Sequence, residues 1–98
     1  MINRIPLNSK ASYQRFTVQL SDRLIEFELR WLVQYDFFAV NLYEAGEAIT
    51  LGRGLHPGVN IVKGLNSGLG SIYLDGQSPT IDNLGVSNRL LYDDDGAE

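Results

Sequence analysis

The chain has 98 residues, of which 44% are hydrophobic and 20% charged, a composition typical of one folded domain. It contains no cysteine and one histidine, which excludes disulfide frameworks, cysteine nucleophiles and metal centres rich in cysteine or histidine. The net charge is −4, but four acidic residues stand among the last six, so residues 1–92 carry eight acidic and eight basic side chains. The basic side chains are scattered rather than clustered, and we expect no sequence-specific nucleic-acid binding.

Apolar and polar side chains alternate every two residues in the first half, which predicts β-strands with one buried face and one face in water. The alternation indicates strands over residues 15–20, 24–31, 37–43 and 48–55, with turns at 21–23 and 44–47 and a break at 34–36. Short strands joined by short connections favour an antiparallel meander. Phe37 and Phe38 are neighbours, so they point to opposite faces, and one of them is expected under the second half of the chain or at a partner interface.

The second half is less regular, because seven of the ten glycines lie between Gly52 and Gly76. Residues 59–65 fit a short strand or a helical turn, and their β-branched side chains favour the extended form. A strand is expected at 71–75, then a loop over 77–85 in which Thr80 caps one helical turn with Asn83, and a last strand at 88–92.

The predicted fold class is therefore all-β, a small antiparallel sandwich or partly open barrel with a glycine-rich irregular second half. Residues 1–92 form this domain, and residues 93–98 form an acidic, flexible tail. The sequence has no run of 18 apolar residues, and residues 1–10 lack the apolar stretch of a signal peptide, so we expect a soluble, cytosolic chain without membrane association.

Glu26 and Glu28 form the carboxylate pair that is a candidate for acid–base catalysis. Glu26 and Glu28 lie two apart on a predicted strand, which places both on one face about 7 Å apart, a separation that overlaps the one inverting glycosidases use. Arg30 continues the same face, and no apolar residue interrupts it to raise a pKa. We favour a solvated strand face for this pair. A hydrolase that uses the two glutamates ranks third, behind two functions that involve no catalysis.

Other candidate groups lack the spacing that chemistry requires. His56 lies in a Leu-His-Pro-Gly turn sequence, and Ser67, Ser71, Asp75 and Asp82 stand at no recognisable distance from it. The glycine-rich residues 64–70 lack the GK[ST] signature and the following helix of a phosphate-binding loop. Asp93, Asp94 and Asp95 are adjacent, whereas a Ca²⁺ loop needs spaced ligands. We expect no catalytic residue, no cofactor and no metal site.

Four segments together carry a family resemblance: Ile5-Pro6-Leu7, then QRFTVQL at 14–20, FAVNLY at 38–43 and DNLGVSNRL at 82–90. The DNLG-x-x-x-RL ending after a glycine-rich middle is the most distinctive. In this order they resemble the small baseplate plug proteins of contractile-tailed bacteriophages, of the cyanophage type. The resemblance implies a non-enzymatic structural protein of the virion, made in the host cytoplasm, which plugs the centre of the tail baseplate and closes the tail tube against hub, spike and tube proteins.

A small β domain without disulfides must cover its sheet edges, so we expect a homo-oligomer or a part of a larger assembly. The residues expected to touch a partner are Phe37, Gly64, Asn66, Gly68 and Gly70. The alternative function is a stand-alone β-barrel that binds a small ligand or sugar, with Trp31 or Tyr73 as a stacking platform.

Overall fold

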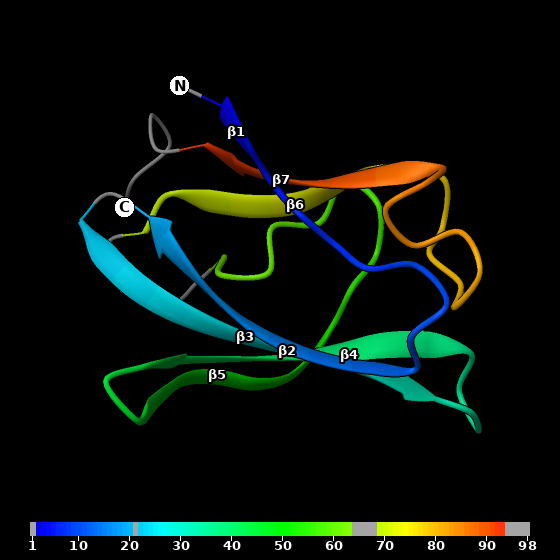
Figure 1. Ribbon diagram of the computed structural model, residues 1–98, viewed down its shortest axis with the longest axis horizontal. Coiled ribbons are helices and arrows are strands. Elements are labelled where there is room, and N and C mark those ends of the chain that lie inside the picture. Colours follow the sequence, from blue (N-terminus) through cyan, green and yellow to red (C-terminus); the bar gives the residue numbers. More distant parts are fainter. Residues whose placement is uncertain (1, 21, 64–68, 94–98) are drawn as a thin grey trace.

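The computed structural model describes residues 2–20, 22–63 and 69–93, which form two antiparallel sheets stacked as the layers of a sandwich (Figure 1). The seven strands are β1 (Ile2–Ile5), β2 (Tyr13–Leu20), β3 (Arg23–Leu32), β4 (Phe37–Glu44), β5 (Glu47–Gly54), β6 (Ser71–Gly76) and β7 (Asn88–Asp93). One sheet has the order β2-β3-β4-β5 and the other β1-β7-β6. The all-β prediction is confirmed, and of the two forms expected the sandwich is found, since the sheets do not close into a barrel. No helix in the described residues is long and apolar enough to cross a membrane.

The four-stranded sheet is the meander that the alternation predicts. Each strand pairs with the next along the chain, and the ends differ from the predicted ones by one or two residues. Ala45 and Gly46 join β4 to β5 with φ of 52° and 83°, the left-handed pair of a type I′ turn, whose twist matches that of the flanking strands.

The inward faces of both sheets form one hydrophobic core. Phe38 is fully buried whereas Phe37, its neighbour, lies on the opposite face and is half-buried, which confirms their opposite orientation. The buried apolar side chains are Ile5, Leu20, Ile25, Phe27, Leu29, Phe38, Val40, Leu42, Leu55, Ile61, Val62, Leu69, Ile72, Leu74, Leu84, Leu90 and Tyr92.

The three-stranded sheet brings together segments that are distant in sequence. β1 was not predicted, because four residues are too few to show an alternation, yet it pairs with β7 from Ile2 opposite Asp93 to Ile5 opposite Leu90. β7 continues through Asp93, one residue beyond the expected end, and residues 94–98 of the predicted tail lie outside the described residues. The division at residue 92 stays a prediction.

The segment that crosses from β5 to β6 corrects one expectation. Residues 61–63 form a turn, not an extended strand, and residues 64–65 of the predicted element lie outside the described part. The cause is Asn60, whose Oδ1 accepts hydrogen bonds from the amides of Val62 at 3.1 Å and Ile72 at 3.0 Å. This side chain bends the backbone locally while Ile61 and Val62 enter the core, so β-branching does not decide the conformation here.

The loop between β6 and β7 contains the capped turn that the sequence predicts. The Thr80 amide donates to Asn83 Oδ1 at 2.7 Å, and the Asn83 amide donates to Thr80 Oγ1 at 3.2 Å. Asn88, the first residue of β7, is only 2% exposed, and its side chain holds the loop together. Its Oδ1 accepts from the Gly85 amide at 2.8 Å, while its Nδ2 donates to Asn83 Oδ1 and to the Gln77 carbonyl, both at 3.1 Å.

Gly85 is the point at which this loop meets the N-terminal segment. Its φ is 79°, and a Cβ atom added there would lie 3.1 Å from the Leu7 carbonyl oxygen and 3.2 Å from Leu7 Cβ. The close approach brings the DNLG and IPL segments of the sequence into contact, and the Lys10 amide adds a hydrogen bond to the Ile81 carbonyl at 2.7 Å.

We predict that Asn88→Ala lowers the free energy of unfolding by about 2 kcal/mol, because it removes the side-chain bonds of a buried asparagine and leaves the partly buried Gly85 amide without its partner. Asn8→Ala is the control, since Asn8 binds Gln14 through its backbone; it should change stability by less than about 0.5 kcal/mol. Urea denaturation measures both, and equal losses would contradict the role given to Asn88.

Two glycine variants separate backbone strain from close packing. Gly46→Ala, with open space around the new Cβ, should lose about 1 kcal/mol through its positive φ alone. Gly85→Ala should lose about 1 kcal/mol more, because Leu7 must also move. Thermal and urea unfolding give the difference, and a Gly85→Ala variant as stable as Gly46→Ala would show that the contact with Leu7 is loose.

Candidate partner-contact surfaces

The outer face of the four-stranded sheet is a polar network centred on Glu28. Glu28 Oε2 accepts from the Tyr13 hydroxyl at 2.7 Å, and Oε1 accepts from the Asn41 amide at 2.8 Å. Beside it, Arg15 donates to Glu26 at 2.6 Å. Neighbouring strands supply these partners because the register places Arg15 and Asn41 opposite Glu28, and Thr17 and Tyr43 opposite Glu26.

The bonds of this network bear on whether Glu26 and Glu28 could act as an acid–base pair. Hydrogen bonds from Asn41 and Tyr13 lower the pKa of Glu28, whereas a general acid needs a raised pKa. The same bond to Glu28 raises the pKa of Tyr13, and the Glu26 carboxylate raises that of Arg15. Glu28 is thus held ionised by donors on adjacent strands, and Glu26 bonds to Arg15, an arrangement that fits the solvated-face interpretation.

His56 and Phe37 belong to an exposed apolar surface at the β3–β4 hairpin, which we call the hairpin patch and define as Val33, Tyr35, Phe37 and His56. The Phe37 ring lies 5.4 Å from His56 and 6.2 Å from Tyr35, measured between ring centres. Val33 is 77% exposed and Tyr35 67%, values that are large for apolar side chains. Phe37, one of the predicted partner contacts, therefore stands within an apolar surface and not alone.

The other predicted contact residues are placed less favourably or not at all. Gly64, Asn66 and Gly68 lie outside the described residues. Gly70 is buried immediately before β6, with φ of 85°. The part of the chain that the structure describes holds no cluster of three or more histidine, aspartate or glutamate side chains that could bind a metal ion.

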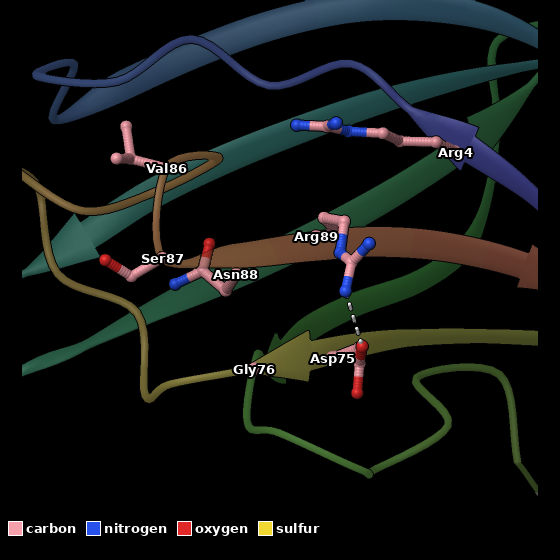
Figure 2. Close-up of a pocket in the computed structure, with 7 residues that line it drawn as sticks. All are labelled: Arg4, Asp75, Gly76, Val86, Ser87, Asn88 and Arg89. Atoms are coloured by element: carbon pink, nitrogen blue, oxygen red, sulfur yellow. Dashed lines mark hydrogen bonds and ion pairs between the residues drawn. The ribbon is translucent and has the colours of Figure 1, made fainter.

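A groove of about 320 Å³ opens where the β6–β7 loop meets the outer face of the three-stranded sheet. Figure 2 shows the Arg89 side chain turned toward Asp75, at 3.4 Å, and Arg4 lying along the groove in the direction of Val86. Arg4 also donates to the Gly85 carbonyl at 3.3 Å. These arginines are already engaged by this chain, and the groove is a shallow polar surface.

Neither proposed stacking platform stands over a cavity between the sheets. Trp31 packs edge-on against Phe38, with ring centres 5.0 Å apart, and is partly buried against the core. Tyr73 is half-buried on β6, opposite Leu91 of β7. Because the core residues fill the space between the sheets and no barrel forms, the ligand-binding β-barrel finds no support here.

Sequence reasoning missed the structural role of the motif that carries the resemblance. Leu84 and Leu90 are in the core, Gly85 contacts Leu7, and Asn83 and Asn88 hydrogen-bond each other. Only one signal pointed this way, the Thr80–Asn83 spacing. A buried asparagine cannot be recognised from a single sequence, because nothing local distinguishes Asn88 from an exposed one.

The comparisons with known proteins agree with this arrangement. The family model described as "Cyanophage baseplate Pam3 plug gp18" matches residues 2–95, and its range includes every described strand. No curated protein matches the chain. With nearly the whole sequence matched, the chain belongs to this family of phage baseplate plug proteins.

Proposed function

We propose that this protein is a non-enzymatic plug at the centre of the phage tail baseplate, which closes the tail tube and contacts hub and spike proteins. The observation that carries the proposal is the match of a baseplate plug family over residues 2–95. The polar network on the outer sheet face supports it, since Glu28 and Glu26 bond to Asn41 and Arg15 of the neighbouring strands.

The hairpin patch is the surface that we assign to the hub or spike contact. Exposed apolar side chains gathered at one hairpin tip are typical of an interface, in which aromatic residues supply much of the binding free energy. The Tyr35, Phe37 and His56 rings contact each other in series, which limits their freedom before any partner binds. The predicted contacts Gly64, Asn66, Gly68 and Gly70 remain part of the proposal.

The test is co-purification of the tagged chain with hub, spike and tube proteins encoded by the same phage. We expect a stable complex, and we expect Tyr35→Ala to weaken it about tenfold, as loss of an interface aromatic does. Leu24→Ala is the matched control, because Leu24 is 63% exposed but lies near the opposite end of β3. Failure of the unmodified chain to bind any of the three proteins would refute the proposed function. Equal weakening by both variants would move the contact away from the hairpin patch.

A further inference from the structure

The four edge strands of this sandwich are not equally protected. β6 is covered, since Gly58 and Ile61 donate their amides to the carbonyls of Leu74 and Ile72, both at 2.8 Å. β5 carries two register shifts against β4, and such bulges disturb further pairing. β1 has four residues and is followed by Pro6, which offers no amide hydrogen.

β2 has none of these features. All eight of its residues pair with β3 without a register shift, and it contains no proline and no lysine. Its outward side chains are held away from the edge, because Tyr13 and Arg15 bond to Glu28 and Glu26 on β3. β2 lacks the proline, the register shift and the covering segment by which natural proteins guard edge strands, and its charged residue Arg15 is paired with Glu26, so this edge is suited to pairing with another strand.

The direction of the backbone groups on β2 follows from its pairing. The Trp31 amide donates to the Ser12 carbonyl at 2.8 Å, which makes this a hydrogen-bonded pair of the ladder. Because such pairs alternate in antiparallel sheets, the backbone groups of Gln14, Phe16 and Val18 face β3. Those of Arg15, Thr17 and Gln19 face outward, and they have no partner in residues 2–20, 22–63 or 69–93.

A groove with mixed polar and apolar lining runs along the same edge. It has a volume of about 450 Å³ and is lined by Pro6, Asn8, Gln14 and residues 16–19. Phe16 and Val18 are half-buried and pack against the core, and the Phe16 ring stacks on Phe27 at 5.3 Å. The core is therefore less completely covered beside β2, and an added strand would bring side chains over it.

We propose that β2 pairs antiparallel with β2 of a second copy of this chain, about a two-fold axis that passes between the two Thr17 residues. In this register Thr17 faces Thr17 and Phe16 faces Val18, an aromatic and a β-branched partner that stabilise each other across strands. Arg15 faces Gln19, so no like charges oppose each other. The two four-stranded sheets become one continuous sheet, and Phe16 and Val18 of each copy cover those of the other.

This inference goes beyond the plug assignment, since it rests on the edge of β2 alone. Loss of binding to hub or spike proteins leaves it intact, and a monomeric chain leaves the plug assignment intact. The first measurement is the mass of the purified full chain by sedimentation over a range of concentrations. A dimer is expected, and a chain that stays monomeric at millimolar concentration would overturn the inference.

Substitution of Thr17 tests the edge itself. Thr17→Pro removes an amide that faces outward and leaves the bonds to β3, so the dimer should dissociate at least about tenfold more readily while circular dichroism stays unchanged. Thr17→Val is the matched control, because it keeps the amide and the β-branch, and it should dimerise as the unmodified chain does. Equal dimerisation of the proline and valine variants would place the contact elsewhere.

A cysteine variant gives a readout that does not depend on tolerance of proline. The chain has no cysteine, so Thr17→Cys introduces a single thiol. Facing residues of a hydrogen-bonded pair have Cα atoms about 5.5 Å apart, a separation that a disulfide spans. Under mild oxidation Thr17→Cys should form a covalent dimer, whereas Leu51→Cys, on bulged β5 and 61% exposed, should not. Equal cross-linking of both variants would refute the pairing.

Discussion

The side chain of Asn88 joins the irregular half of the chain to the sheets. It accepts from the Gly85 amide and donates to Asn83 and to the Gln77 carbonyl, so one buried amide fixes three points of the β6–β7 loop. A loop held in this way can place Leu84 in the core and Gly85 against Leu7. The contact with Leu7 in turn fixes the segment between β1 and β2. Asn88 thus helps to place a segment that is far from it in sequence.

The first half of the fold was predictable because its signals are local. Two-residue alternation predicts which side chains face the core. In a meander each strand pairs with the next one along the chain, so its topology can be predicted from the order of the strands alone. The adjacency of Phe37 and Phe38 even predicted one outward aromatic, which the structure places in the hairpin patch. In the second half, long-range bonds decide the conformation. Asn60 bends residues 61–63 through a bond to Ile72, and β1 exists because β7 pairs with it, so neither could be inferred from nearby residues.

Of the candidate contact surfaces, one could also be predicted from local sequence and the other could not. Phe37 could be named from sequence because its adjacency to Phe38 on a strand places one of the two aromatic rings on the outer face. Whether an edge is open cannot be read from its own residues, because protection comes from elsewhere: β6 is covered by the segment at Gly58 and Ile61, and β5 is disturbed by bulges. β2 differs from them in having neither a covering segment nor a register shift against its neighbour. The polar network around Glu28 is equally non-local, since Tyr13, Asn41 and Glu28 come from three strands.

In the proposed assembly, both contact surfaces of this chain bind with moderate strength. A hydrogen bond exchanged with water contributes only about 1 kcal/mol net, so a strand-to-strand contact and one small apolar patch bind with moderate strength. The outer sheet face contributes little to the binding free energy, because its charged side chains already pair with one another and remain solvated. In the proposed assembly, association depends on backbone pairing at β2 and on aromatic contacts at the β3–β4 hairpin. These surfaces lie on different parts of the sandwich, so the proposed second copy on β2 would leave the hairpin patch free for another baseplate protein.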